Sequence, residues 1–398
     1  MAIKGGQILH VGNGFVIDRI QTGGITGINV NEDRIEELGN VEAVGTLRDI
    51  PDLTFEIESY DVSTELESVL LGGDNSEVGG TEFDLVDAVP LNVLSPFKGS
   101  GVFTVDGGVI VPHLYLESMS YSFSLGDPAT MTATMRGDSV FYVPGSVYQE
   151  EFDGDAVTTV FSFTDGPAYK STINGEDYYG LSVTVDGVRQ RLGTDYTNTA
   201  TGVTFLAGSI PASGTGNIVV TYGSGVSSTY LQAVHEDTSV KPAGVRGRDT
   251  FVRLGDGQVS PTYSDWLGVQ SANVDWSVSL ERDEEFGNPM VVAQDFDTPE
   301  VSGSITMKPA SVSALMAQIQ AITLNTGTDI PNATDDPPEI QVQIKTVDGT
   351  GTTTKTWFVE KAKFTTPQLS GSVGSKLETD FSFTSADGVL KIYKADQP

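Results

Sequence analysis

The chain has 398 residues, 38% of them hydrophobic and 19% charged, which indicates a folded protein of two or three domains. It contains no cysteine, so disulfide bonds and cysteine metal sites are excluded. The formal net charge of −32 argues against sequence-specific binding of DNA or RNA, because so acidic a surface repels phosphate. We expect neither a secretory signal nor a membrane span, since no apolar run approaches the roughly 18 residues that a span needs.

The strong negative charge has three explanations, which the sequence leaves open. It can serve as a soluble surface that repels other copies of itself. It can reflect adaptation to high salt. It can also form an anionic surface along which a polyanion slides without binding.

The first third of the chain is predicted to hold strands and one short helix. Leu53–Glu58 alternates apolar and polar residues, as a half-buried strand does. A short helix is predicted to begin near Ser63, which can cap it, and to carry Leu66, Val69 and Leu70 on one face. Further strands are predicted at Phe15–Ile20, Tyr121–Phe123 and Met131–Met135.

The middle of the chain, residues 147–226, reads as a module of its own. Gly- and Ser-containing joints border it, at Pro144-Gly145-Ser146 and Gly223-Ser224-Gly225. Its alternating runs, separated by turn residues, predict a small Ig-like β-sandwich. Its predicted strands are Val157–Thr164, Leu181–Val185, Val203–Phe205 and Ile218–Tyr222.

The last third repeats the order of the first. A strand at Val301–Thr306 is followed by a predicted helix, in which Pro309 suits the first position and an apolar stripe runs from Val312 to Ile319. Other strands are predicted at Thr250–Leu254, Ala362–Phe364 and Phe381–Phe383. Pairs that favour type I′ hairpin turns occur throughout the chain, at Asp106-Gly107, Asp165-Gly166, Asn174-Gly175, Asp186-Gly187, Asp348-Gly349 and Asp387-Gly388.

A sequence repeat explains this order. Asp33–Asn40 (DRIEELGN) matches Glu281–Asn288 (ERDEEFGN) at an offset of 248 positions (287 − 39 = 248). Without a gap, the same offset aligns further identical residues, namely Val44 with Val292, Asp49 with Asp297, Pro51 with Pro299, Ile57 with Ile305 and Ser63 with Ser311. The chain is therefore predicted to be duplicated, with domains at 1–146 and 227–398 on either side of the insert.

The segments after each Gly-Asn are candidates for assembly contacts. We expect residues 38–51 and 286–299 to form long arms or loops that touch neighbouring subunits, because both copies keep the Gly-Asn and the Asp-x-Pro. A plain hairpin turn followed by the start of a strand is the alternative. The candidate contact residues are Leu38, Gly39, Asn40, Asp49, Pro51, Phe286, Gly287, Asn288, Asp297 and Pro299.

The sequence contains no strong catalytic motif. We therefore predict that the chain is not an enzyme and has no catalytic residue, metal site or cofactor. The three histidines, His10, His113 and His235, show no zinc-binding spacing. Acidic neighbours such as Glu36-Glu37, Asp283-Glu284-Glu285 and Asp335-Asp336 are expected by chance among 54 acidic residues. Tyr178-Tyr179 and Tyr196 are weak candidates for sugar binding by the insert.

The run from Arg48 to Asp61 (RDIPDLTFEIESYD) resembles the tail tube (major tail) proteins of long-tailed double-stranded DNA viruses, and so does the closing pattern from Phe358 to Phe383. The insert, with Val183–Gln190 and Gly193–Tyr196, is similar to decorative modules of virion proteins. The resemblance implies an all-β fold with short helices: two tandem tail-tube β-sandwich or barrel domains and one inserted sandwich.

The resemblance also implies a role. Such proteins form stacked rings around a DNA channel, and two domains per chain imply a trimeric, pseudo-hexameric ring with an electronegative lumen. The implied partners are other copies of the chain, a tape measure protein, tail-end or terminator proteins, and passing DNA that is not specifically bound, with no membrane. The implied location is the virion, after assembly in the host cytoplasm. An inner-tube protein of a contractile injection system, or another self-assembling surface or glycan-binding protein, is the alternative.

Overall fold

The computed structural model is all-β in the residues that it describes, as the sequence predicts. Within these residues, only Glu67 and the short 3-10 turn η2 (Gly247–Asp249) are helical. The described residues are 9–11, 15–17, 20–29, 32–35, 45–48, 52–60, 67, 82–84, 91–98, 105–138, 140–143, 146–164, 166–168, 170–173, 176–179, 181–186, 188–190, 195–224, 245–255, 264–265, 268–283, 293–308, 339–347, 352–365, 368–370 and 378–393.

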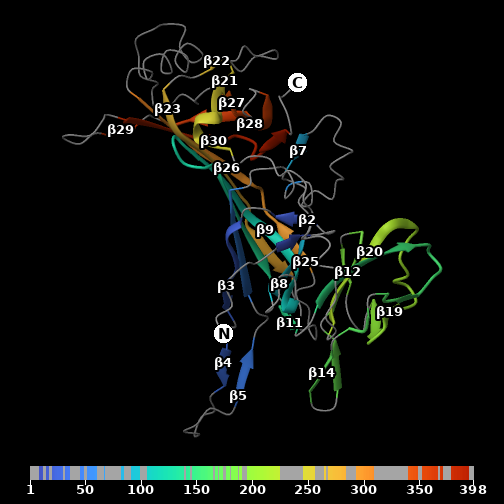
Figure 1. Ribbon diagram of the computed structural model, residues 1–398. Helices are drawn as coiled ribbons and strands as arrows, with labels where there is room; N and C mark the ends of the chain where they lie inside the picture. The colour runs from blue at the N-terminus through green and yellow to red at the C-terminus, as the bar shows by residue number, and fades with distance from the viewer. Residues whose placement is uncertain are drawn as a thin grey trace.

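One continuous antiparallel sheet runs through both halves of the chain (Figure 1). Its first four strands come from the first half, and β9 of that half pairs directly with β23 of the second half. The order is β3 (Ile20–Asn29), β6 (Asp52–Ser59), β10 (Thr130–Gly137), β9 (Val105–Ser124), β23 (Val269–Ser277), β26 (Glu300–Met307), β30 (Glu378–Ser385) and β29 (Gln368–Ser370).

Further strands flank this sheet at each end. In the first half, β9 also pairs with β8 (Leu91–Lys98) and β11 (Phe141–Val143), and β8 pairs with β1 (Leu9–Val11), which pairs with β2 (Phe15–Ile17). In the second half, β28 (Thr353–Phe364) pairs with β30, β27 (Glu339–Val347) and β31 (Lys391–Tyr393). β27 then pairs with β21 (Thr250–Leu254), which pairs with β22 (Ser264–Asp265). β7 (Glu82–Asp84) of the first half pairs with β31 of the second half.

Strict alternation of residue types explains why these segments form strands. β6 and β10 bury every second residue, which places apolar side chains on one face and polar ones on the other. A single apolar cluster lies on the buried face and crosses the boundary between the halves. Its largest fully buried side chains include Phe55, Tyr121, Trp276, Trp357, Phe381 and Phe383. Each such residue stabilises the fold by roughly 1.5–3 kcal/mol.

The strands repeat at the same offset as the sequence. β6 begins at Asp52 and β26 at Glu300, and β10 begins at Thr130 and β30 at Glu378, so each pair of counterparts is 248 positions apart (300 − 52 and 378 − 130). Pairing registers repeat too, since Ser59 faces Met131 just as Met307 faces Thr379. The two halves therefore build one strand pattern twice. The domain boundaries at 1–146, 147–226 and 227–398 stay a prediction.

The two copies differ in how they fill their cores. In the first copy, Phe55 faces Met135, whereas the corresponding pair in the second copy is Gly303 and Phe383. A Cβ atom added to Gly303 would collide with the Phe383 ring and with the backbone oxygen of Asn273. The phenylalanine of this pair thus lies on the opposite strand in the second copy, where Gly303 leaves room for its ring.

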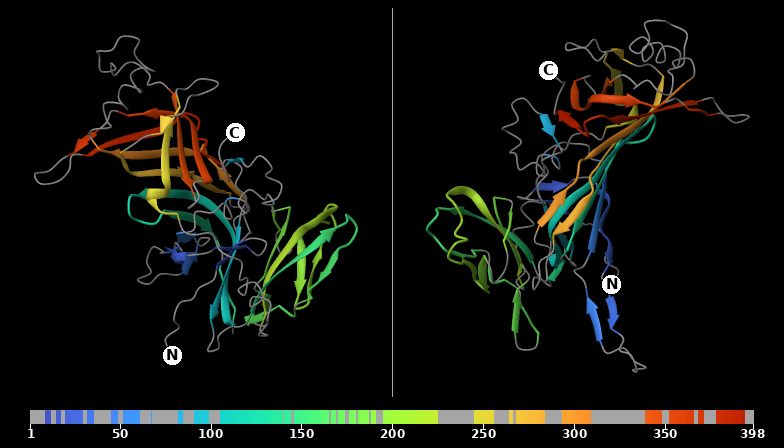
Figure 2. Two further views of the ribbon diagram at one scale, coloured as in Figure 1. Left: turned by 45° about the horizontal axis from the view of Figure 1, so that its top comes forward. Right: turned by 180° about the vertical axis from the view of Figure 1, so that it is seen from behind.

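The insert has a hydrophobic core of its own. It forms a separate group of strands beside the large sheet (Figure 2). One sheet has the order β12 (Ser146–Gly154), β20 (Gly214–Ser224), β16 (Leu181–Val185) and β17 (Val188–Arg189). The other has the order β13 (Val160–Ser162), β19 (Gly202–Phe205) and β18 (Tyr196–Thr199). A hairpin of β14 (Lys170–Ile173) and β15 (Glu176–Tyr179) completes it. Tyr148 and Tyr222 from one sheet and Phe161 and Phe205 from the other meet in the core.

Three local expectations need correction or qualification. Asp106-Gly107 lies inside β9 and forms no hairpin turn; the ladder with β8 continues on both sides of it and shifts register between the Pro96–Gly108 and Lys98–Val105 pairs. The strand predicted at Val157–Thr164 is confined to β13, since Asp155 accepts hydrogen bonds from the backbone N–H groups of Val157 and Thr158 and holds a turn there. Apart from Glu67, the two predicted helices lie outside the described residues.

The predicted arms are partly strands. β4 (Glu32–Ile35) pairs with β5 (Gly45–Arg48), and β24 (Leu280–Asp283) pairs with β25 (Ala293–Phe296), in the same register at an offset of 248 positions (280 − 32 and 293 − 45). In each copy the Gly-Asn therefore falls between two paired strands. Residues 45–48 and 293–296 are therefore hairpin strands and not loops, and their contact with neighbouring subunits stays a prediction.

Candidate functional site: the polar sheet face and the junction of the two copies

The face of the continuous sheet that points away from the core is lined by hydroxyl and acidic side chains. Register partners share a face, so each row can be followed across the strands. One row is Glu58, Thr132, Ser120, Asp275, Ser302 and Thr384, and another is Thr130, Ser122, Asn273, Ser304 and Ser382. These rows pass from the first copy into the second without interruption, and we call this surface the polar face.

Hydrogen bonds between neighbouring strands order the polar face. Ser120 of β9 donates to the Asp275 carboxylate of β23, and the Asn273 amide donates to the same carboxylate at 2.8 Å. Thr306 Oγ1 donates to Asp380 at 2.7 Å, and Thr22 Oγ1 donates to Glu58 at 3.1 Å. The carboxylates are thus held by short hydroxyl side chains in fixed positions.

The polar face is predominantly anionic. Its carboxylates are those of Asp52, Glu56, Glu58, Asp275, Glu300 and Asp380. Among the described side chains of β6, β10, β23, β26 and β30, Arg136 is the only basic residue on this face, and Lys363 of β28 continues the first row opposite Thr384. Lys and Arg side chains dominate the binding of nucleic-acid phosphates, and on this face carboxylates outnumber them.

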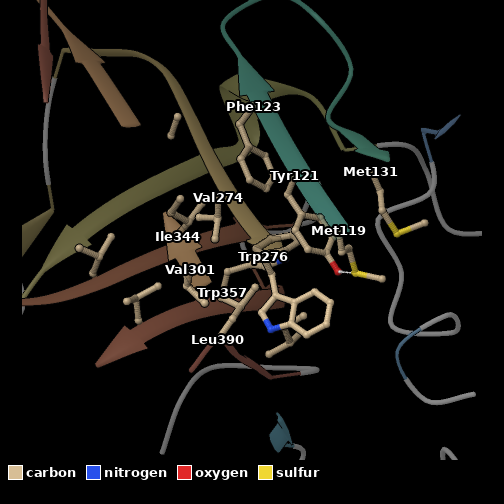
Figure 3. Close-up of a cluster of buried hydrophobic side chains, with 14 of the residues drawn as sticks. Met119, Tyr121, Phe123, Met131, Val274, Trp276, Val301, Ile344, Trp357 and Leu390 are labelled. Carbon is tan, nitrogen blue, oxygen red and sulfur yellow. Dashed lines mark hydrogen bonds between the residues drawn. The ribbon is translucent and has the colours of Figure 1, made fainter. Parts of the chain in front are cut away.

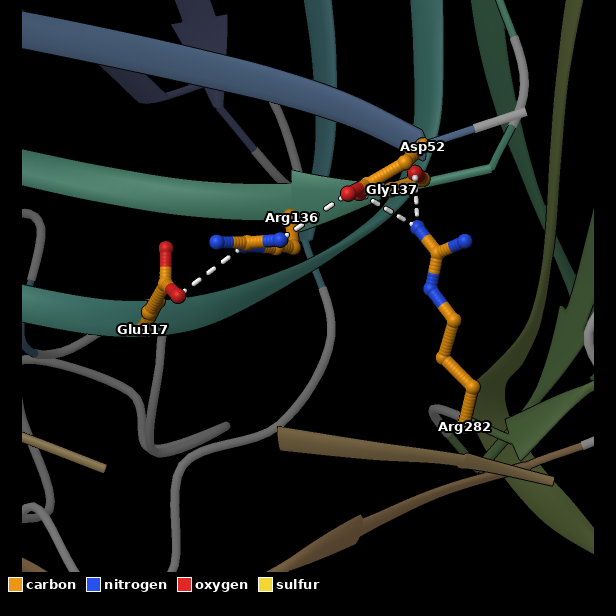
Figure 4. A network of polar contacts seen from close by, with 5 residues as sticks. All are labelled: Asp52, Glu117, Arg136, Gly137 and Arg282. Carbon is orange, nitrogen blue, oxygen red and sulfur yellow. Dashed lines mark hydrogen bonds and ion pairs between the residues drawn. The ribbon is translucent and has the colours of Figure 1, made fainter. Parts of the chain in front are cut away.

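An ion-pair network joins the two copies at one end of this face (Figure 4). Asp52 of β6 contacts Arg136 of β10 at 2.9 Å and Arg282 of β24 at 2.6 Å. Arg136 also contacts Glu117 of β9 at 2.9 Å, and Arg282 donates to the backbone oxygen of Gly137 at 3.3 Å. The contact with Glu117 raises the pKa of Arg136, and Asp52 adds to this. The side chains are 21–37% exposed, so water weakens the pairs only in part.

A second connection between the copies is buried beside the hydrophobic cluster that contains Tyr121 and Trp357 (Figure 3). The Lys355 ammonium of β28 pairs with the Glu67 carboxylate, which also accepts a hydrogen bond from Tyr121 of β9. Lys355 lies 5.0 Å from the centre of the Tyr121 ring and 4.9 Å from that of Trp357. Burial raises the pKa of Tyr121 well above 10, and the neighbouring Glu67 charge adds to it. The pair fixes a residue after β6 in the first copy to a strand of the second copy.

Few of the ten candidate contact residues can be placed. Leu38, Gly39, Asn40, Asp49, Pro51, Phe286, Gly287 and Asn288 lie outside the described residues. Asp297 is exposed, and its backbone N–H donates to Ser279 at 3.0 Å. Pro299 is half-buried beside Gly388. A role of these residues in assembly stays a prediction.

Sequence reasoning missed most members of the two connections. Arg282 lies in the repeated motif, but its partners Asp52 and Gly137 are distant in sequence. Lys355 in β28 and the helical Glu67 carry no local signal, because an isolated charged side chain is usually solvated. One feature of the sequence pointed to this site: Arg34 and Arg282 occupy equivalent positions in the two copies of the repeat.

Other kinds of site find little support. No group of three or more His, Asp or Glu side chains that could hold a metal occurs within the described part of the chain. Tyr196 is 4% exposed and packs near Phe205, so this residue is not available to stack on a sugar. Across the described residues, none of the helical structure is long and apolar enough to cross a bilayer.

Comparison with known proteins gives weak similarities. No protein-family model and no curated protein matches the chain. Among solved structures, the anti-feeding prophage (AFP) baseplate, 6-fold symmetrised, contains a chain that is 13% identical, with a TM-score of 0.29, covering 39% of this chain and 97% of that chain. A chain in the tail of an empty GTA particle, refined with C6 symmetry, is 14% identical, with a TM-score of 0.25, covering 36% of this chain and 96% of that chain. At these TM-scores the similarity carries no conclusion about this chain.

Proposed function

We propose that the chain is a structural tail tube subunit that assembles into stacked rings, three chains to a ring, around a channel for viral DNA. In this role no catalytic residue is needed. The chain has to present strand edges to its neighbours and a non-adhesive surface to the DNA. Tape measure and tail-end proteins are the further partners that such a tube requires.

The continuous sheet is the observation that carries this proposal. The two copies share one ladder through β9 and β23, with the apolar rows on one side and the polar face on the other. A repeat unit that joins edge to edge inside one chain can join edge to edge between chains, and contacts that close by rotation form rings. Closure also removes exposed sheet edges, which are otherwise sites of aggregation.

The charge of the polar face supports DNA as the passing cargo. If the polar face lines the channel, Glu56, Glu58 and Asp275 repel the phosphate backbone, and the Ser and Thr hydroxyls keep the wall wet. Attraction would slow the passage of DNA, since each neutralised phosphate adds to the affinity. At physiological salt the Debye length is about 8 Å, so the repulsion acts only near the wall and does not block entry.

Electron microscopy of the purified full-length chain tests this function. We expect hollow rings or tubes with threefold chain symmetry and sixfold pseudo-symmetry, with the polar face inward. A chain that stays monomeric at all concentrations, or rings whose lumen is lined by basic residues, would refute it. An inner tube of a contractile injection device shares the same physics, so a sheath around native particles would identify that alternative.

A further inference from the structure

We propose that β3 of one chain pairs antiparallel with β29 of a second copy, in the register in which β23 pairs with β9 inside the chain. This inference rests on the proposed function and specifies its contact between chains. The partner is a second copy of this same chain. The internal duplication provides the template, because one chain contains the same junction already formed.

The two ends of the continuous sheet are the counterparts of the two strands at its centre. β3 pairs only with β6, and β29 pairs only with β30, among the strands that the structure describes. β3 corresponds to β23, since Ile28 faces Leu53 as Trp276 faces Val301. β29 corresponds to the end of β9, since Gln368 faces Asp380 as Ser120 faces Thr132. Within the described part of the chain, β3 and β29 thus each have one edge that pairs with no strand, whereas their counterparts β23 and β9 pair with each other.

The register between chains follows from the register inside the chain. Ser120, Tyr121 and Ser122 face Asp275, Val274 and Asn273. The ladder of β3 with β6 shifts between Ile25 and Gly27, so Thr26 is an extra residue with no counterpart in β23. Transferring the register then pairs Gln368 with Gly27, Leu369 with Ile25 and Ser370 with Gly24. A register shifted by one residue would turn the apolar residues of β3 to the polar face.

Exposure at β3 supports the pairing independently. Ile28 is 44% exposed, whereas its counterpart Trp276 is 2% exposed. Both occupy the same position on the apolar side of the sheet, but Trp276 has β9 beside it and Ile28 has only β6. A large apolar side chain on an open strand edge promotes aggregation of a monomer. A strand of a second copy, in the position relative to β3 that β9 has relative to β23, would cover Ile28.

The ion-pair network has a counterpart as well. Arg34 holds in β4 the position that Arg282 holds in β24, and Glu300 holds in β26 the position that Asp52 holds in β6. The same transfer places Arg34 of one copy beside Glu300 of the other. Arg136 corresponds to Thr384, so the junction between chains lacks the second arginine and is the simpler of the two.

Cysteine cross-linking tests the register, because the natural chain contains no cysteine. In full-length protein, we expect the double variant Gly27→Cys with Gln368→Cys to form covalent dimers and trimers on mild oxidation, seen on non-reducing gels. Directly opposed residues in an antiparallel pair lie about 4.5–5.5 Å apart at Cα, within the reach of a disulfide. A Cβ at Gly27 meets no atom within 4 Å, so the variant folds without strain there.

Two matched variants complete the design. Ser120→Cys with Asp275→Cys opposes the corresponding positions inside one chain, so it should lose its free thiols while running as a monomer. Thr22→Cys with Gln368→Cys is out of register by four residues, roughly 13 Å, and should stay uncross-linked. If the Gly27→Cys/Gln368→Cys variant forms rings or tubes but keeps as many free thiols as the Thr22→Cys/Gln368→Cys variant, the proposed strand pairing is wrong. The proposed ring would not be contradicted by that result. A wild-type chain that forms no ring overturns the proposed function itself.

A charged residue at the open edge gives a second test. We expect Ile28→Lys to abolish rings and tubes and to keep the thermal melt of the monomer, because this side chain is already 44% exposed. Ile28→Val should assemble as the wild type does. Normal tubes from Ile28→Lys would contradict the inference.

Discussion

Replacing Lys355 with Met should destabilise the chain strongly at neutral pH. Glu67 is fully buried and Lys355 is 2% exposed, so the variant leaves a carboxylate in the core without its countercharge. Breaking such a pair costs about 3–5 kcal/mol. We take about 4 kcal/mol, the middle of this range, as the expected loss at pH 7.

Thermal unfolding followed by near-UV circular dichroism measures this loss. With about 2.1 cal/mol/K of unfolding entropy per residue over 398 residues, 4 kcal/mol lowers the melting temperature by about 5 °C. The matched control is Glu67→Gln with Lys355→Met, which keeps an acceptor for Tyr121 and leaves no buried charge, so it should recover most of the loss at pH 7. A Lys355→Met melt within 1 °C of the wild type at pH 7 would refute the reasoning.

Three further variants test the fold and its junction, each by thermal melts. Gly303→Ala should cost about 1–3 kcal/mol because its Cβ collides with the Phe383 ring, and an unchanged melt would contradict this packing. Arg282→Ala should cost about 1 kcal/mol through its contacts with Asp52 and Gly137, whereas Arg248→Ala, whose side chain is 66% exposed, should change stability by less than about 0.5 kcal/mol. Because the folded pKa of Tyr121 is raised, its contribution is present below about pH 10 and is lost as the pH rises through the folded pKa. Tyr121→Phe should therefore flatten the alkaline fall in stability relative to the wild type, and an unchanged slope would count against this role.

The strand pattern was readable from the sequence because it depends on local alternation. Leu53–Glu58 and Val301–Thr306 lie within β6 and β26, and the offset of 248 found between Gly39 and Gly287 (287 − 39) recurs in the strand starts. A buried face needs an apolar residue at every second position, and a turn needs Gly or Asn, so these features are recorded in neighbouring residues. The predicted turn at Asp106-Gly107 does not form, because this dipeptide is part of β9, which pairs with β8 on both sides of it.

What the sequence could not determine was how the two copies meet. The pairing of β9 with β23, the Asp52–Arg282 contact and the burial of Lys355 beside Glu67 each join residues more than 140 positions apart. Such contacts depend on which strand edges and side chains come together after both copies have folded, and no local pattern encodes them. The sequence by itself determined that one β unit is used twice around an insert. The tertiary structure alone decided that the two units share a single sheet, because edge pairing is made by backbone groups that every residue carries.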